Sequence, residues 1–180
     1  METIEKFSLK GKAAIVTGAT RGLGQGIAIG LAGAGADIVG VGRSDHSQTR
    51  EKIEKLGRRY LELKLDMGEN TTPELVVQKT MEQFGKVDIL VNAAGITRRV
   101  MAIDISRKDW QDVLDVNLTA LFFMCQAVAR QFIKQGGGGK IINIGSMTSY
   151  QGGIKVIPYT ASKAAVRNIT MHMCNEWAAP

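Results

Sequence analysis

The chain has 180 residues, of which 44% are hydrophobic, and its formal net charge is +6. This length supports one domain with a sizeable core and is short for two ordinary domains, so we expect residues 1–180 to form a single domain. Basic and acidic residues alternate through Glu51–Glu62, which indicates a solvated surface and no nucleic-acid partner. The two cysteines, Cys125 and Cys174, lie far apart in the sequence and predict neither a disulfide framework nor a metal site.

The N-terminal segment Met1–Lys12 mixes acidic and basic residues and lacks the apolar core of a signal peptide. No later apolar run approaches the ~20 residues that a membrane-spanning helix requires. We therefore expect a cytoplasmic protein that has no membrane partner.

A glycine-rich turn follows the first predicted strand, Lys12–Thr17, and precedes a predicted helix over Gln25–Ala34. The turn reads Gly18-Ala-Thr-Arg-Gly22-Leu-Gly24, and its spacing differs from the G-x-G-x-x-G fingerprint. A strand, a glycine turn and a helix N-terminus in this order bring backbone N–H groups and the positive end of a helix around an anion. The pattern predicts a site for the pyrophosphate of a dinucleotide.

The next predicted strand, Asp37–Val41, ends at Gly42-Arg43-Ser44. In dinucleotide-binding folds, an acidic residue roughly twenty positions after the glycines holds the ribose 2′-hydroxyl. Arg43 stands at this place, and a guanidinium is suited to a phosphate. This favours NADP over NAD, with an ordinary exposed arginine as the alternative.

Strand and helix patterns alternate along the rest of the chain. We predict helices over 44–56, 71–84 and 110–135, strands over 60–64, 87–91 and 140–143, and a last helix over 159–177. Thr71-Thr-Pro-Glu74, and Ser106 with Asp109, are typical of helix N-termini. The helix over 110–135 carries an apolar stripe that consists of Leu114, Leu118, Leu121, Cys125, Val128 and Phe132. The alternation predicts right-handed crossovers and thus an α/β fold with a Rossmann-like, doubly wound parallel sheet.

Ser146, Tyr159 and Lys163 are the strongest candidates for chemistry. The run Lys140–Asn143 predicts a buried strand that ends near Gly145, so Ser146 follows the carboxyl end of a strand, where open α/β sheets bind ligands. Tyr159 and Lys163 are four positions apart on a predicted helix and therefore share a face. A phenol titrates near pH ~10, and a neighbouring ammonium group favours its ionised form.

We therefore expect Tyr159 to exchange a proton with a carbinol or carbonyl oxygen, which Ser146 would hold by a hydrogen bond. Hydride must go to a cofactor, because no side chain accepts it. Each feature alone has an ordinary explanation. A tyrosine four positions before a lysine is typical of an amphipathic helix, and a serine after a strand is typical of a cap or a turn. A mid-helix asparagine such as Asn117 is typical of a helix surface.

Together, these motifs resemble the short-chain dehydrogenase/reductase family in order and spacing across nearly the whole chain. The matching segments are Thr17–Gly24, Asp66, Asn92-Ala-Ala-Gly95, Asn117, Ser146 and Tyr159-Thr-Ala-Ser-Lys163. The resemblance implies an NAD(P)-dependent oxidoreductase that interconverts a secondary alcohol and a ketone. It implies a catalytic tetrad of Asn117, Ser146, Tyr159 and Lys163. In this tetrad, Asn117 would hold a water that relays protons to Lys163. Lys163 would also bind the nicotinamide ribose.

The resemblance also implies the residues that contact the cofactor. The three glycines of the turn would lie under the pyrophosphate, Asp66 would meet the adenine, and Asn92 would support the central strand. The whole expected set is Gly18, Thr20, Arg21, Gly22, Leu23, Gly24, Arg43, Asp66, Met67, Asn92, Ala93, Gly95, Tyr159 and Lys163. Ala93 stands where many members of the family have a second asparagine.

Within the family, the chain most resembles dehydrogenases of 2-deoxy-D-gluconate and 2-dehydro-3-deoxy-D-gluconate, which are associated mainly with NAD. The resemblance rests on the segments 7–12, 95–99, 109–113, 121–124, 150–155 and 175–177. A sugar acid carries a carboxylate, which a cation binds well. The expected substrate contacts are Arg98, Arg99, Ser146, Lys155 and Tyr159, and ordinary surface charge is the alternative for the three cations.

Two other functions remain open. A 3-oxoacyl-[acyl-carrier-protein] reductase would use the same tetrad, and its acidic carrier would suit the basic surface. A non-catalytic nucleotide-binding or interaction protein would bind the cofactor without turnover.

Members of the family are commonly dimers or tetramers, and the helices from Trp110 and from Tyr159 resemble their shared interface. Compared with the family, the C-terminal strands and the substrate lid are missing after Pro180, which would leave Lys140–Asn143 as an uncovered edge strand.

Overall fold

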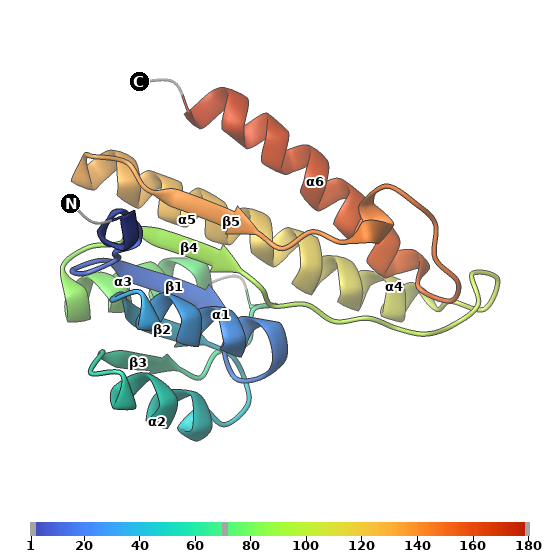
Figure 1. Cartoon of the computed structure of the whole chain (residues 1–180). Helices are drawn as coiled ribbons and strands as arrows, with labels where there is room; N and C mark the ends of the chain where they lie inside the picture. The colour runs from blue at the N-terminus through green and yellow to red at the C-terminus, as the bar shows by residue number, and fades with distance from the viewer. Residues whose placement is uncertain (1–2, 70–71, 179–180) are drawn as a thin grey trace.

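A computed structural model of the chain describes residues 3–69 and 72–178 (Figure 1). Five parallel strands form one sheet in the order β3-β2-β1-β4-β5. They are β1 (Ala13–Thr17), β2 (Asp37–Val41), β3 (Tyr60–Leu63), β4 (Ile89–Asn92) and β5 (Lys140–Asn143). The strand order reverses between β1 and β4, which is the point where open α/β sheets bind ligands. The predicted Rossmann-like, doubly wound parallel sheet is therefore confirmed.

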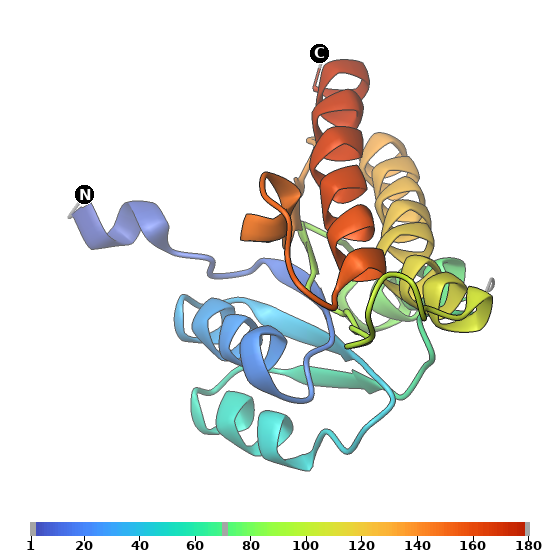
Figure 2. The same cartoon turned by 90° about the vertical axis from the view of Figure 1, so that its right-hand side faces the viewer.

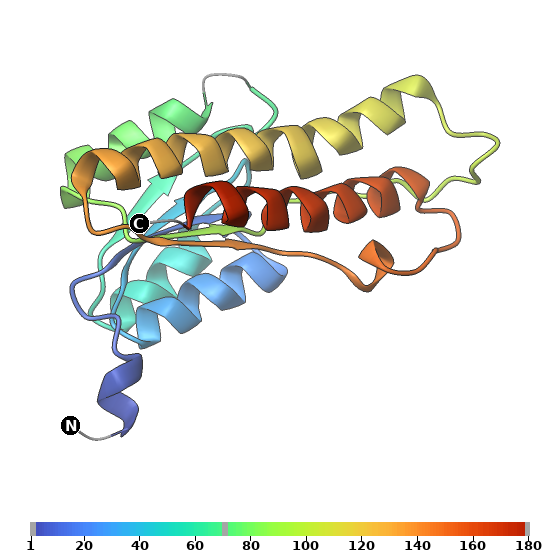
Figure 3. The same ribbon diagram turned by 90° about the horizontal axis from the view of Figure 1, so that it is seen from above.

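Helices cover both faces of the sheet (Figure 3). One face carries α1 (Gly22–Gly33) and α2 (Ser47–Lys55), and the other carries α3 (Thr72–Phe84), α5 (Ala120–Gln135) and α6 (Ile157–Trp177). A π-helical segment, Asp115–Thr119, joins α4 (Arg107–Leu114) to α5. Short 3-10 helices span Thr3–Phe7 and Met147–Ser149, and the first of them projects away from the sheet (Figure 2).

Alternating strand residues fill a core on each face of the sheet. Ile15 of β1 packs with Val76 of α3 and Leu121 of α5, whereas its neighbour Val16 packs with Ala28 of α1. Every residue of β1, β2 and β4 is buried, as expected of parallel strands that helices cover on both sides. These central strands give rigid support to the turns at their carboxyl ends.

Two helices on the first face differ from their predicted bounds. The helix α1 begins at Gly22 instead of Gln25, so its first residue, which has a φ of +58°, lies inside the glycine turn. The helix α2 is shorter at both ends than the predicted span 44–56, since Asp45 binds the backbone N–H of Ser47 in a turn before it. Thr71, in the predicted capped start of α3, lies outside the described residues.

The helices α4 and α6 also begin earlier than predicted. Ser106 accepts a hydrogen bond from the backbone N–H of Asp109 at 3.0 Å, so the predicted cap is present and α4 starts at Arg107. The helix α6 starts at Ile157, because Pro158 is accommodated in its first turn.

The strand β5 differs from the buried strand predicted for this run. Its residues alternate between exposed and half-buried, and Ile142 is 46% exposed. In the described part of the chain, β5 lies at one edge of the sheet and pairs with β4 alone, so the prediction of an edge strand is confirmed. Its β-branched composition predicts a strand without distinguishing an edge from the centre of a sheet.

The continuous helix from Arg107 to Gln135 has 29 residues and is long and apolar enough to cross a membrane by length and composition alone. The sequence pattern did not predict such a stretch. Half of its apolar window is buried inside the structure, where four of the six predicted stripe residues are buried: Leu121, Cys125, Val128 and Phe132. A core helix has this property, and we interpret the segment as one.

Candidate active site

The glycine turn between β1 and α1 forms a cradle of backbone atoms. Gly18 and Gly22 adopt φ angles of +71° and +58°, which favour glycine. A Cβ atom at Gly18 would lie 2.9 Å from the backbone of Ala94, and one at Gly24 would overlap the carbonyl oxygen of Gly18. Arg21, the N-cap residue of α1, makes no side-chain capping bond, so it does not cover the first N–H groups of the helix. Such a helix start can bind a phosphate.

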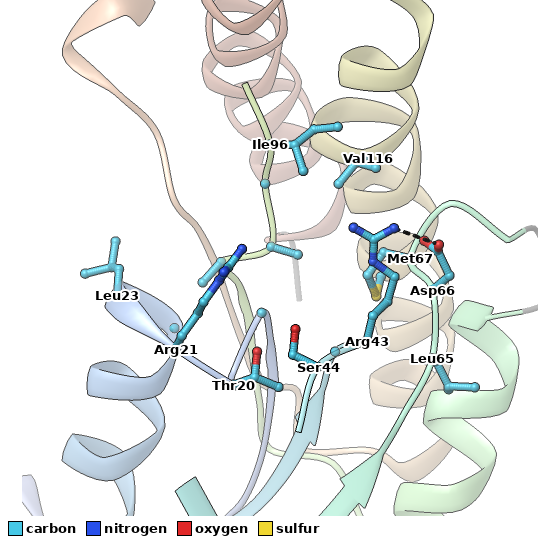
Figure 4. A pocket seen from close by; sticks show the side chains of 16 residues that line it. Thr20, Arg21, Leu23, Arg43, Ser44, Leu65, Asp66, Met67, Ile96 and Val116 are labelled. Atoms are coloured by element: carbon cyan, nitrogen blue, oxygen red, sulfur yellow. Dashed lines mark hydrogen bonds and ion pairs between the residues drawn. The ribbon is translucent and has the colours of Figure 1, made fainter. Parts of the chain in front are cut away.

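A cleft of about 210 Å³ lies above this cradle (Figure 4). Ten of the fourteen residues predicted to contact a cofactor line it: Gly18, Thr20, Arg21, Leu23, Gly24, Arg43, Asp66, Met67, Ala93 and Gly95. Six further lining residues were not predicted, namely Gly42, Ser44, Leu65, Ala94, Ile96 and Val116. Each of these six is next in sequence to a predicted site residue, and this adjacency is the signal that would have found them.

The other four predicted cofactor residues, Gly22, Asn92, Tyr159 and Lys163, do not line this cleft. Asn92 is buried and donates from Nδ2 to Oδ1 of Asn143 at 2.9 Å, which ties β4 to β5 beneath the site.

Thr17, at the end of β1, was not predicted as a site residue. Its Oγ1 accepts hydrogen bonds from the backbone N–H groups of Ala93 and Ala94, both at 3.1 Å. These bonds hold the turn after β4 against β1, at the point where the strand order reverses. A threonine at the carboxyl end of a buried strand is a weak signal that could have pointed to this role.

Arg43 and Asp66 meet at one side of the cleft (Figure 4). Nη1 of Arg43 lies 3.2 Å from Oδ2 of Asp66, and both side chains are partly exposed. Exposed ion pairs contribute only about 0–1 kcal/mol, so this pair opens at little cost. The structure thus brings together the side chains assigned from the sequence to the ribose phosphate and to the adenine.

The helix α6 places Tyr159 and Lys163 on the same side, with Nζ of Lys163 5.8 Å from the centre of the Tyr159 ring. Lys163 is 4% exposed and donates to the carbonyl oxygen of Ile144 at 2.6 Å. Burial lowers the pKa of Lys163, because an ammonium group is less well solvated there than in water. An ammonium has three donors, so two remain for other partners.

Ser146 precedes the 3-10 helix Met147–Ser149 and caps it. Its Oγ accepts hydrogen bonds from the backbone N–H and the hydroxyl of Thr148, at 3.2 and 2.9 Å. The proton of the Ser146 hydroxyl is donated to none of the residues that the structure describes, which leaves it for a substrate oxygen. Oγ of Ser149 donates to the carbonyl oxygen of Lys163 at 2.9 Å and joins this segment to α6.

Asn117 is fully buried in the π-helical segment, contrary to the surface position that its residue type suggests. Its Oδ1 accepts from the N–H of Ile96 at 2.8 Å, and its Nδ2 donates to the carbonyl of Ile96 at 2.9 Å and to Oγ of Ser162 at 3.2 Å. Ser162 in turn donates to the carbonyl oxygen of Tyr159 at 2.7 Å. Asn117 therefore connects the loop that lines the cleft with the helical turn that carries Tyr159.

Arg98, the first cation predicted to contact a substrate, is bound to α4. Its Nε lies 3.1 Å from Oδ1 of Asp109, and its Nη2 lies 3.7 Å from Oδ2 of Asp112. Hydrogen bonds from Ser106 and then from Arg98 lower the pKa of Asp109. Two acids already neutralise this arginine, so it is the weakest of the three candidates for a substrate carboxylate.

The other two cations, Arg99 and Lys155, are exposed, and neither forms an ion pair within residues 3–69 and 72–178. Lys155 has a φ of +62°, which is unusual for a residue with a side chain. Its carbonyl oxygen accepts a hydrogen bond from the N–H of Val100 at 3.0 Å. This bond pairs the loop after β4 with the loop that precedes Tyr159.

Comparisons with known proteins agree with this geometry. A family model described as short chain dehydrogenase matches residues 12–180. The 2-dehydro-3-deoxy-D-gluconate 5-dehydrogenase of Dickeya dadantii is 56% identical over 175 residues, which cover 97% of this chain and 69% of the relative. A 3-oxoacyl-[acyl-carrier-protein] reductase of Vibrio cholerae is 37% identical over 173 residues, which cover 96% and 70%.

A solved structure also matches. The crystal structure of a gluconate 5-dehydrogenase from Burkholderia cenocepacia in complex with NADP and tartrate is 37% identical, with a TM-score of 0.91. The match covers 98% of this chain and 70% of that one. The predicted resemblance to sugar-acid dehydrogenases is confirmed, and the chain belongs to the short-chain dehydrogenase/reductase family of oxidoreductases that act on CH–OH groups.

Proposed function

We propose that the protein is a cytoplasmic, NAD(P)-dependent dehydrogenase that interconverts a secondary alcohol and a ketone on a small sugar acid. Its substrate would be 2-dehydro-3-deoxy-D-gluconate or a similar acid such as 2-deoxy-D-gluconate. The observation that carries this proposal is the 56% identity to the Dickeya dadantii enzyme, in a chain whose α6 sets Lys163 beside Tyr159.

The lining of the cleft supports the binding of a nicotinamide dinucleotide. Gly18 and Gly24 have no side chains where a Cβ atom would meet backbone, so the turn can close tightly and present the N-terminus of α1 to a pyrophosphate. Asp66 and Met67 line the cleft where the adenine would lie. When bound, the nicotinamide exchanges hydride with the substrate carbon, a step that no protein side chain supplies.

Arg43 supports a preference for NADP over NAD. Among the described residues it donates to Asp66 alone, and a guanidinium has five N–H donors, so a 2′-phosphate can bind as well.

We expect Arg43→Ala to weaken NADP binding by about tenfold, the worth of one charge-assisted hydrogen bond, and to change NAD binding little. Fluorescence titration checks this, with Arg50→Ala as a control because Arg50 pairs with Glu62 outside the cleft. Tighter binding of NAD than of NADP by the unaltered protein would contradict the preference.

Tyr159 would exchange a proton with the carbinol oxygen while hydride leaves or reaches the same carbon. The ammonium group of Lys163 lies near the phenol ring and would stabilise negative charge on it. Ser146 would donate its hydroxyl proton to the substrate oxygen and hold that oxygen against Tyr159.

Asn117 would support this arrangement. Both of its amide hydrogens are already bound, to Ile96 and to Ser162, so it fixes the turn of α6 that carries Tyr159. Any water that relays protons to Lys163 would then donate a hydrogen bond to an oxygen atom of Asn117.

Arg99 and Lys155 would bind the substrate carboxylate. They lie on paired loops, and Lys155 holds a strained backbone conformation next to the catalytic helix, as residues at functional sites often do.

Replacing either Arg99 or Lys155 with alanine should raise KM for a sugar acid by about tenfold, which corresponds to roughly 1.4 kcal/mol. Steady-state kinetics measures this, with exposed Lys10→Ala as the control. Unchanged KM values in both variants would contradict the assignment.

A 3-oxoacyl thioester reductase is the second candidate, favoured by the 37% identity to the Vibrio cholerae enzyme and by the net charge of +6. Initial rates with a sugar acid and with an acetoacetyl thioester separate the two. We expect kcat/KM to be at least about tenfold larger for the sugar acid, the discrimination that a few correctly placed polar contacts supply. A larger value for the thioester would favour the reductase, and cofactor binding without any turnover would favour a non-catalytic binding protein.

A further inference from the structure

A buried network of side chains connects α2 to the turn after β2, beneath the cleft. His46, at the N-terminus of α2, is completely buried. Its Nε2 lies 3.2 Å from the carbonyl oxygen of Gly42, and its Nδ1 lies 2.6 Å from the hydroxyl of Tyr60. Gly42 and Arg43 line the cleft, so His46 holds the peptide that leads directly to Arg43.

The two partners of His46 determine which of its nitrogens carries the proton. The carbonyl oxygen of Gly42 can only accept, so Nε2 must be the donor. In a neutral imidazole, Nδ1 is then the acceptor, and the hydroxyl of Tyr60 donates to it. Burial raises the pKa of Tyr60, which keeps this hydroxyl protonated. For the neutral ring, the directions of both hydrogen bonds of His46 follow from these partners.

Two glycines make room for the network. A Cβ atom at Gly40, in the middle of β2, would overlap the hydroxyl of Tyr60. A Cβ atom at Gly42 would lie 3.0 Å from Cγ2 of Thr20 and 3.8 Å from Nε2 of His46. Glycine weakens the interior of a strand, so the close approach of Tyr60 explains why Gly40 stands in β2.

The helix α2 also holds the glycine turn. Oγ1 of Thr49, which is buried, donates to the carbonyl oxygen of Ala19 at 2.9 Å and accepts from Nε2 of Gln25 at 2.8 Å. Gln25 further donates to the carbonyl oxygen of Thr20 at 3.2 Å. The first turns of α2 thus connect both backbone segments that form the floor of the cleft.

We propose that His46 is a positioning residue that orients the Gly42–Arg43 peptide for the adenosine end of the cofactor and so helps to select NADP over NAD. This inference rests on the proposed dinucleotide-dependent function. The hydroxyl of Tyr60 donates to Nδ1 and holds the imidazole ring in place, and Nε2–H of His46 holds the carbonyl oxygen of Gly42. The guanidinium of Arg43 has one partner among the described residues, Asp66, so its direction depends on the backbone that carries it.

Two substitutions of His46 separate its hydrogen bond from its bulk. In His46→Gln the amide nitrogen can replace Nε2 and keep the donor to Gly42, whereas His46→Leu fills the space and loses the donor. We expect His46→Leu to weaken the binding of NADP and of 2′,5′-ADP by about tenfold and that of NAD by less than about threefold. His46→Gln should restore the NADP affinity to within about threefold.

Tyr60→Phe gives a second test that keeps the aromatic ring and removes the hydroxyl that holds Nδ1 of His46. We expect it to lower the ratio of NADP to NAD affinity, whereas Tyr150→Phe, which alters an exposed tyrosine, should leave the ratio unchanged. Isothermal titration with the same three ligands, together with a melting curve for each variant, measures the effects.

The outcomes distinguish this inference from the function on which it rests. If the unaltered protein binds neither NADP nor NAD, the proposed function fails. If it binds them, and folded His46→Leu has the same affinity ratio as the unaltered protein, the role of His46 is overturned. Should His46→Leu fail to fold, an unchanged ratio in folded Tyr60→Phe overturns it instead.

Discussion

Burial of Lys163 positions its ammonium group and at the same time disfavours the charge on that group. Lys163 must be buried to hold the carbonyl oxygen of Ile144 near Tyr159, and burial lowers its pKa from the ordinary value of 10.5. Between the folded pKa and 10.5, the unfolded chain therefore binds more protons than the folded one. The free energy of unfolding must rise with pH in that window, because the lysine sheds the charge that burial penalises.

Lys163→Met removes this dependence. We expect the unfolding free energy of the unaltered protein to rise, relative to that of Lys163→Met, as the pH approaches 10.5 from below. Denaturant unfolding at a series of pH values measures the two curves. The exposed Lys10→Met should run parallel to the unaltered protein. Parallel curves for Lys163→Met and the unaltered protein would show that the lysine is not desolvated.

The pairing of Tyr159 with Lys163 could be predicted from the sequence because their relationship is local. Tyr159 and Lys163 are four positions apart on one helix, so their pairing follows from helical geometry. His46 and Tyr60 are 14 positions apart, and Thr17 and Ala93 are 76 apart, so their contacts arise only when the sheet assembles. Asn117 was placed in the tetrad by family resemblance alone, because helix propensity points to a surface position that its tertiary hydrogen bonds override.

At the level of elements, the start of α1 is formed by glycine for a steric reason. Gly24→Ala would place a methyl group on the carbonyl oxygen of Gly18, so the turn must move. We expect this variant to lose dinucleotide binding by at least about a hundredfold, since the turn supplies the phosphate site. Gly30→Ala in the same helix meets nothing within 4 Å and is the matched control. It should keep the affinity and gain about 0.5–1 kcal/mol of stability. Equal binding by both variants would contradict the role of the turn.

The strand β2 begins with a buried carboxylate that connects it to β3. Asp37 accepts hydrogen bonds from Arg58 and Arg59, in the connection between α2 and β3. Burial alone would raise the pKa of Asp37, but the hydrogen bonds from Arg59 and then from Arg58 outweigh it and leave the pKa below 3.8. The stability that these bonds provide is complete above 3.8 and is lost as the pH falls through the folded pKa.

Asp37→Asn is therefore expected to lower the free energy of unfolding by about 2 kcal/mol at neutral pH, the scale of hydrogen bonds to a charged group. The difference from the unaltered protein should shrink as the pH falls from 3.8 through the folded pKa, because the carboxylate becomes protonated first in the unfolded and then in the folded state. Urea unfolding at several pH values measures it, with the exposed Asp104→Asn as control. A difference that does not vary with pH would contradict the account.

The sequence predicted all five strands, because their apolar and β-branched runs are local patterns. It did not predict that β5 is half exposed, since burial depends on the position of a strand in the sheet. The π-helical turn over Asp115–Thr119 was also missed. Contacts of Asn117 with Ile96 and Ser162, which lie on other segments, accompany that turn, and no local spacing encodes them.

At the level of the whole molecule, α6 packs against α4 and the π-helical segment that leads into α5, and both α5 and α6 expose large apolar side chains. These are Phe123, Ile133, Ile157, Met171 and Trp177. Exposed apolar groups on neighbouring helices are typical of association surfaces. We propose that two copies of the chain associate through these helices.

Light scattering should therefore give the mass of a dimer or tetramer. Phe123→Glu should reduce that mass, because burying a carboxylate in an apolar interface is unfavourable. Phe7→Glu, on the N-terminal segment that projects from the sheet, should leave the mass unchanged (Figure 2). A monomeric unaltered protein at micromolar concentration would contradict this association.

The most direct test of the whole account is turnover by Tyr159→Phe, with the affinity for NADP(H) measured on the same preparation. We predict that kcat for a sugar acid falls by at least about a hundredfold, the usual contribution of a general acid–base group, while cofactor affinity changes by less than about threefold. Tyr150→Phe should match the unaltered protein in both. Turnover by Tyr159→Phe equal to that of the unaltered protein would contradict the claim that this phenol moves the proton.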